Sequence, residues 1–207
     1  CIFSLFKSKL YNFIICYNNS KKLNHLESKN DVIISNKKPS YKISNLFLQY
    51  LNKYNRVEDL PVQYNDLLRY VGSVDVFDKQ ENNTLWQRVY YNENERFELE
   101  NNLKKIYNVL YSDGSDKNTD FFIFYGIDYC TFGNSNPFRV KIRNKLNDNF
   151  TYFYIKKADS SRVYGLELEH ITSPYNLNYI LNDITLIEEH ISGIPGDDFF
   201  KNKLADC

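Results

Sequence analysis

The chain lacks the residues and patterns that mark many classes of enzyme. Its 207 residues include no Met, one Trp, four Cys and three His. The cysteines form no C-x-x-C pair and the histidines are scattered, which excludes the usual spacing of a zinc site. A P-loop, a G-x-S-x-G nucleophile turn and an H-E-x-x-H helix are missing from the sequence as well. We therefore expect no metal site in this chain.

Charge of one sign is not in excess either. The 26 basic and 26 acidic residues give a formal net charge of +0. Because proteins that track a phosphate backbone carry an excess of Lys and Arg, no nucleic-acid partner is expected. The 43 % share of hydrophobic residues is enough for the core of one ordinary domain, and it argues against a disordered chain.

A long uninterrupted apolar run is also missing. Residues Cys1–Tyr17 contain two apolar clusters, but Lys7 and Lys9 interrupt them, so no stable membrane span of about 20 residues is predicted. The pattern is typical of a secretory signal remnant with basic flanks, and a buried helix is the alternative. The polar stretch Asn18–Ser44 reads as a linker. Residues 1–40 are thus expected to be an apolar leader and a polar linker.

Helical periodicity dominates the next part of the chain. Between Ile43 and Tyr54 the apolar residues recur at spacings of three and four, and Ser44 is available as the N-cap. The same spacing predicts helix over Thr84–Tyr111, where the polar stretch Asn92–Glu95 leaves open whether there is one helix or two. Residues 41–115 are therefore predicted to form a helical extension.

After this region the period changes to that of β-structure. Three short runs rich in aromatic and β-branched residues predict consecutive antiparallel strands: Phe121–Ile127, Phe138–Ile142 and Thr151–Lys157. A last helix is expected within Tyr175–Ile191, stopped by Gly193 and Pro195. The fold class is therefore predicted as α+β, with the helical extension followed by a small antiparallel sheet and one helix over residues 116–207.

This order of elements is the layout of the small lobe of a protein kinase: two strands joined by a glycine-containing turn, a third strand ending in Lys, and a helix carrying Glu. The expected turn, Gly126–Asn134, contains Gly126 and Gly133 but not the G-x-G-x-x-G spacing. A plain hairpin with positive φ at both glycines is the alternative. Alternation along the third strand places Lys156 on one face and Lys157 on the other.

Three segments, Gly126–Gly133, Phe138–Ile142 and Tyr154–Lys157, resemble the FIKK family of apicomplexan serine/threonine protein kinases, which is named for a Phe-Ile-Lys-Lys motif on the third strand. The general layout matches from Trp86 to Ile194, and the close resemblance covers Gly126–Lys157. The family implies phosphoryl transfer from ATP, with Mg²⁺, to Ser or Thr of a protein substrate.

The resemblance also implies an ATP-binding site made by Gly126, Gly133 and a lysine, either Lys156 or Lys157. A carboxylate is also needed to hold this lysine in place. Glu188 and Glu189 lie on the expected last helix and are the candidates for the ion pair, whereas Glu167 and Glu169 fall in a segment without an assignment. Tyr154 replaces the Phe of the motif and stands where kinases keep a small residue against the adenine, which would narrow that pocket.

The sequence departs most from a kinase in what it omits. It contains neither an H-R-D catalytic loop nor a D-F-G metal aspartate, and Asp198-Phe199-Phe200 is only superficially similar to the latter. We therefore expect a fragment, the N-terminal extension plus part of the small lobe, with no catalytic residues of its own. The family further implies export to the host cell and action on a host cytoskeletal protein.

A function of another class remains open at this point. The aromatic helical stripe over Trp86–Tyr111 is also compatible with a noncatalytic, exported interaction module that binds a host or parasite protein. A contiguous exposed aromatic patch on the folded protein would favour such a module, and full burial of Trp86, Tyr90 and Tyr107 would remove the reason to propose it.

Overall fold

The computed structural model describes residues 39–111, 119–133 and 135–193. The chain divides into a unit of residues 1–36 and a unit of residues 37–207, and all described residues belong to the second unit. The expected leader and most of the expected linker lie outside the described residues, as does the tail from residue 194 onward.

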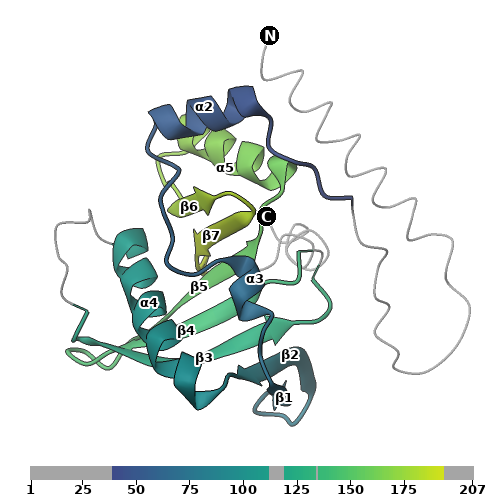
Figure 1. Ribbon diagram of the computed structural model, residues 1–207, viewed down its shortest axis with the longest axis vertical. Helices are drawn as coiled ribbons and strands as arrows, with labels where there is room; N and C mark the ends of the chain where they lie inside the picture. Colours follow the sequence, from purple (N-terminus) through teal and green to yellow (C-terminus); the bar gives the residue numbers. More distant parts are fainter. Residues whose placement is uncertain (1–38, 112–118, 134, 194–207) are drawn as a thin grey trace, which may run out of the picture. The chain divides into compact units, whose positions relative to one another are not determined.

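In the described residues the protein forms one seven-stranded antiparallel sheet of order β1-β2-β3-β4-β5-β7-β6 (Figure 1). The strands are β1 (Gly72–Phe77), β2 (Asn83–Tyr90), β3 (Phe122–Cys130), β4 (Phe138–Asn144), β5 (Phe150–Lys157), β6 (Tyr179–Asn182) and β7 (Thr185–Glu189). Four helices accompany them: α2 (Asn45–Lys53), α3 (Tyr64–Leu67), α4 (Glu93–Tyr111) and α5 (Ser160–Thr172).

Strict alternation along the central strands gives the sheet two different faces. On β4 the buried residues Phe138, Val140 and Ile142 alternate with the basic residues Arg139, Lys141 and Arg143. On β5, Phe153 and Ile155 pair with Val140 and Phe138, so they add to the same apolar face. Because successive side chains of a strand point to opposite faces, the basic residues share the other face.

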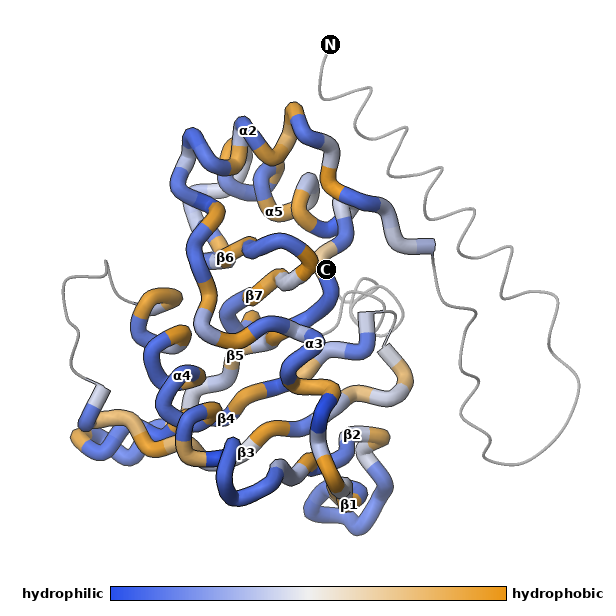
Figure 2. Tube along the Cα trace, in the orientation of Figure 1, coloured by the Kyte–Doolittle hydropathy of each residue, from blue (hydrophilic) through white to orange (hydrophobic). Residues whose placement is uncertain are grey.

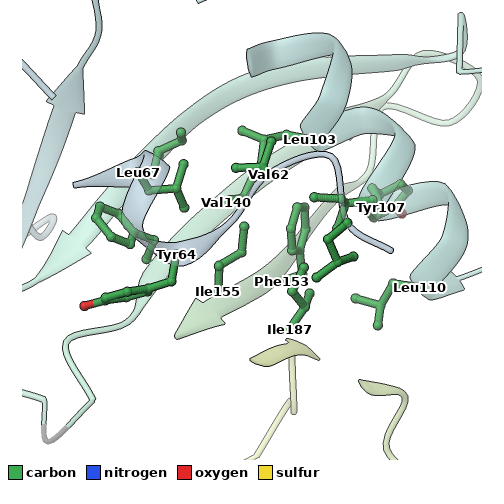
Figure 3. Close-up of a cluster of buried hydrophobic side chains, with 14 of the residues drawn as sticks. Val62, Tyr64, Leu67, Leu103, Tyr107, Leu110, Val140, Phe153, Ile155 and Ile187 are labelled. Atoms are coloured by element: carbon green, nitrogen blue, oxygen red, sulfur yellow. The ribbon is translucent and has the colours of Figure 1, made fainter. Parts of the chain in front are cut away.

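The main core lies between the apolar face of the sheet and helices α3 and α4. Figure 3 shows side chains from α3 and α4, among them Leu67 and Leu103, pointing toward strand residues such as Phe153 of β5. The fully buried members include Leu67, Leu103, Ile106, Phe138, Phe153 and Ile155. Packing of large side chains on both layers fixes the position of α4 over the sheet.

A second, smaller core lies on the other face, at the β6–β7 end. There Leu51 of α2, Val163 and Leu166 of α5, and Leu181 and Leu186 of the hairpin are buried together. Their neighbours on β6 and β7, Ile180 and Ile187, belong to the main core. Helices α2 and α5 therefore cover the face opposite to α3 and α4.

Several predicted elements are confirmed. The helix expected over Ile43–Tyr54 is α2, and the hydroxyl of its N-cap Ser44 accepts a hydrogen bond from Phe47 N. The three consecutive antiparallel strands are β3, β4 and β5. The sheet is larger than expected, because four further strands join it.

The prediction of helix over Thr84–Tyr111 is wrong in its first part. Residues Asn83–Tyr90 form β2, which pairs with β1 on one side and β3 on the other, and helix begins only at Glu93. Local spacing fits a helix here, but two rows of strand hydrogen bonds override that weak local preference.

The helix expected over Tyr175–Ile191 is also wrong. This segment contains the β6–β7 hairpin, whose turn has Asp183 at a φ of 45°. Asn and Asp tolerate the left-handed conformation that such tight turns need, so Asp183-Ile184 is a two-residue turn between β6 and β7 and not the middle of a helix. The helix that follows β5 is α5, and the side chain of its N-cap Asp159 accepts a hydrogen bond from Arg162 N.

Hydrophobic stretches along the described chain are short and alternate with hydrophilic ones (Figure 2). Within the segments that the structure describes, no helix combines the length and apolar character that a membrane crossing requires.

We expect Phe153→Ala to lower the free energy of unfolding by about 3–5 kcal/mol, because it removes a fully buried ring from the main core. The matched control is Phe150→Ala on the same strand, where the ring is 44 % exposed, and a loss of about 1 kcal/mol or less is expected. Urea denaturation of the two variants measures the difference. Equal losses would contradict the assignment of the core face.

Candidate functional site

A row of directly opposed residues crosses the sheet on the face opposite α3 and α4. Following the strand pairings from β2 to β7, it consists of Arg88, Asp128, Arg139, Tyr154 and Glu188. We call these five residues the ionic row. Directly opposed residues of antiparallel strands share a face, so the pairing register alone brings these side chains together.

Asp128 is the centre of the first group, which we call the Asp128 cluster (Arg88, Asp128 and Arg139). Its carboxylate is almost fully buried; Oδ1 accepts from Arg88 Nε at 2.5 Å and Oδ2 accepts from Arg139 Nη2 at 2.8 Å. The Arg139 guanidinium also lies 4.3 Å from the centre of the Trp86 ring. Two guanidinium groups share one carboxylate, so the cluster carries one surplus positive charge.

Glu188 is the centre of the second group, the Glu188 cluster (Lys156, Arg162 and Glu188). Its Oε2 accepts from Lys156 Nζ at 2.9 Å and from Arg162 Nη2 at 2.6 Å, while Oε1 accepts from Arg162 Nε at 2.8 Å. The side chains of Glu188 and Lys156 are 3 % and 17 % exposed. This cluster too has two cations for one carboxylate.

Electrostatics keep the Glu188 carboxylate ionised despite its burial. Burial by itself would raise the pKa of Glu188, but the hydrogen bonds and charges of Arg162 and Lys156 outweigh it and hold this pKa below its usual range. Burial lowers the pKa of Lys156, and the neighbouring Glu188 carboxylate opposes that shift. Glu188 and Lys156 therefore each oppose the effect of burial on the other's charge.

Tyr154 lies in the ionic row between the two clusters. Its ring centre is 6.3 Å from that of Trp86, and its hydroxyl is 3.1 Å from His190 Nδ1. Burial raises the pKa of Tyr154, so the hydroxyl is neutral at physiological pH. The middle of the row is thus filled by an aromatic side chain.

The two lysines at the end of β5, the third of the predicted strands, have different surroundings. Lys156 is half-buried in the Glu188 cluster, whereas Lys157 is exposed and belongs to the opposite face of β5. Of the two glutamates expected to hold the lysine, Glu188 pairs with Lys156. Glu189 instead accepts a hydrogen bond from Asn178 N at 2.8 Å.

The expectation that the lysine's partner lies on a helix is wrong, because Glu188 belongs to strand β7. Glu167, on α5, is taken by other residues: its Oε1 accepts from Arg56 Nε at 3.0 Å and from the Tyr179 hydroxyl at 2.5 Å. Helix α5 contributes Arg162, which is the second cation of the Glu188 cluster.

The expected turn Gly126–Asn134 starts later than predicted, because β3 continues to Cys130. Gly126 lies inside β3 at a register shift, and neither it nor Gly133 has a φ in the left-handed region that favours glycine. A Cβ atom at Gly126 would come within 2.4 Å of Arg88 Nη1, so this glycine leaves room for the Asp128 cluster. Gly133 does lie between β3 and β4, where a Cβ would be 3.0 Å from Pro137 Cδ.

Sequence reasoning missed four members of the two clusters: Arg88, Asp128, Arg139 and Arg162. The alternation in Phe138–Ile142 carried a signal for Arg139, because every second residue of that strand is basic. For Arg88 and Arg162 no local pattern exists, since their partners are 40 and 26 residues away along the chain.

The region expected to form an aromatic helical stripe does not do so. Trp86 lies on β2 beside the Asp128 cluster, Tyr90 at the end of the same strand is 52 % exposed, and Tyr107 of α4 is buried in the main core. These three side chains do not form one helix face.

The described part of the chain contains no group of three His, Cys, Asp or Glu side chains arranged to hold a metal ion. A hollow of about 130 Å³ opens beside the first cluster, lined by Arg88, Gly126 and Arg96 among others. Pockets for drug-sized ligands have volumes of about 300–1,000 Å³, so this hollow is too small to enclose a nucleotide.

Comparisons with known proteins add no relative. A comparison with protein-family models found no match, and neither did one with curated proteins or one with solved structures.

We expect Glu188→Gln to lower the free energy of unfolding at pH 7 by about 3 kcal/mol, because Lys156 and Arg162 would lose their buried counterion. The folded chain holds the pKa of Glu188 below the unfolded value of about 4.3, so its contribution is present above that pH and is lost as the pH falls through the folded pKa. The Glu188→Gln variant should therefore show a shallower loss of stability in acid than the wild type.

Urea denaturation between pH 7 and pH 3 measures both effects. Glu189→Gln is the matched control, since its carboxylate bonds only Asn178 among the described residues. Equal losses of stability in the two variants would contradict the description of Glu188 as the buried counterion of Lys156 and Arg162.

Proposed function

We propose that residues 122–189 form part of the small lobe of a FIKK-type serine/threonine protein kinase and that Lys156 contacts the phosphates of ATP. The observation that carries the proposal is the Lys156–Glu188 pair, a half-buried lysine at the end of a strand with a carboxylate 2.9 Å from its Nζ. Kinases need such a pair because the lysine must stay charged and in place to neutralise the α- and β-phosphates.

The order of elements supports the same reading. Three consecutive antiparallel strands, β3, β4 and β5, are followed by helix α5 and by the β6–β7 hairpin, and β7 pairs directly with β5. Lys156 lies near the end of β5, on the side of the β3–β4 turn that contains Gly133, since Ile155 pairs with Phe138. The position of the lysine on this side of the sheet supports the proposal, because a phosphate-binding site needs the lysine close to such a turn.

In this proposal the lysine's partner differs from the usual one. Glu188 of β7 takes the part that a helix glutamate has in other kinases, and α5 supplies the cation Arg162. The donors of Lys156 and Arg162 suit phosphate oxygens, which accept charge-assisted hydrogen bonds. Bound ATP with Mg²⁺ would supply the transferable phosphoryl group.

The rest of the proposal concerns the wider protein. Phosphoryl transfer to Ser or Thr of a protein substrate needs a catalytic loop and a metal aspartate that this sequence does not contain. The proposal also includes export to the host cell and action on a host cytoskeletal protein. Both come from the family resemblance alone.

We expect the full chain to bind an ATP analogue, and Lys156→Gln to weaken that binding by about tenfold or more, because one charge-assisted contact to phosphate is lost. Lys157→Gln is the matched control, one residue away and on the other face, and its affinity should equal that of the wild type. Titration calorimetry with and without Mg²⁺ measures the affinities.

Thermal unfolding of each variant controls for folding. Absence of binding by the folded wild-type chain would contradict the proposal. Equal weakening by both substitutions would also contradict it, because the contact would then be diffuse attraction and not a site at Lys156.

A further inference from the structure

We infer that this site recognises the polyphosphate of its ligand and not the base, so that nucleoside triphosphates of any base and inorganic tripolyphosphate are equivalent ligands. The inference rests on the proposed function, whose nucleotide site it makes more specific. It concerns the Asp128 cluster and the Glu188 cluster together, which lie on the same face of the sheet.

The first observation is the charge of the face. The two clusters combine the four cations Arg88, Arg139, Lys156 and Arg162 with the two carboxylates Asp128 and Glu188, which leaves two surplus positive charges. The two carboxylates are about 3 % exposed, whereas the arginines are between 25 % and 43 % exposed. An anion approaching this face therefore meets guanidinium groups and no accessible carboxylate of these clusters.

The second observation is the spacing of the cations. Arg139 pairs with Tyr154, so it is the diagonal neighbour of Lys156 across β4 and β5. The backbone positions of diagonal neighbours on one face of an antiparallel pair are about 7–8 Å apart. A chain of two or three phosphates is long enough to contact side chains from both positions.

The third observation is that, among the described residues, the aromatic groups between the clusters already have partners. A slot that reads a base needs apolar walls and a few polar atoms that await a partner. Here Tyr154 occupies the middle of the row, with Trp86 beside it and Arg139 4.3 Å from the Trp86 ring. The Tyr154 hydroxyl is already at hydrogen-bond distance from His190.

The test compares ATP, GTP and inorganic tripolyphosphate, each with Mg²⁺, by titration calorimetry on the full chain. The expected dissociation constants agree within about threefold, since the base contributes little. ATP binding at least about tenfold tighter than both GTP and tripolyphosphate would overturn this inference and leave the proposed function standing. Binding of none of the three would overturn both.

Two substitutions locate the site. Arg139→Gln is expected to weaken tripolyphosphate binding about tenfold, because it removes a guanidinium that faces the ligand. Lys141→Gln is the matched control on the same strand and face: Lys141 Nζ lies 4.1 Å from the Phe150 ring centre and takes part in no ion pair among the described residues. Its affinity should stay within about twofold of the wild type.

Should Arg139→Gln fail to fold, as shown by thermal unfolding, Arg88→Gln replaces it, since Arg139 still neutralises Asp128 in that variant. Equal weakening by the cluster variant and by Lys141→Gln would overturn the inference, because general attraction of a polyanion to a basic face would then explain the binding.

Discussion

Two buried carboxylates, Asp128 and Glu188, constrain the face of the sheet on which the proposed function depends. A buried carboxylate is strongly destabilising unless cations and hydrogen bonds surround it. Asp128 therefore holds Arg88 of β2 and Arg139 of β4 to β3, and Glu188 holds Lys156 of β5 and Arg162 of α5 to β7. The two carboxylates and their four cations thus connect six elements of the fold: β2, β3, β4, β5, β7 and α5.

This constraint also explains how one sheet combines a core and a charged surface. The apolar residues of β4 and β5 face α3 and α4, and the alternate residues are left for the ionic row. Because each carboxylate is shared by two cations, the face keeps a positive charge although the whole chain has a net charge of +0. A neutral composition can therefore conceal a local excess of positive charge.

The sequence was sufficient to predict the elements whose signals are local. Helix α2 follows from apolar spacing and its Ser44 cap, and β3, β4 and β5 follow from short aromatic and β-branched runs. Alternation along β5 separated Lys156 from Lys157 correctly. These features depend on neighbours within a few residues, so a pattern in the sequence can show them.

The remaining elements depend on partners far along the chain. Residues Asn83–Tyr90 have helical spacing, yet pairing with both β1 and β3 makes them a strand. Glu188 is one of the two candidates that the sequence offers as the lysine's partner, but its position on β7 follows from pairing with β5, which no local pattern reveals. The Asp128 cluster was missed for the same reason, since Arg88 and Asp128 are 40 residues apart.

The most direct test of this account is a double-mutant cycle with Lys156→Gln and Glu188→Gln, in which urea denaturation gives the free energy of unfolding of the wild type, both single variants and the double variant. If Glu188 holds Lys156 in place, the double variant should lose less stability than the sum of the single losses, with a coupling of about 1–3 kcal/mol. A coupling below about 0.3 kcal/mol would show that the two side chains act independently and would contradict the account.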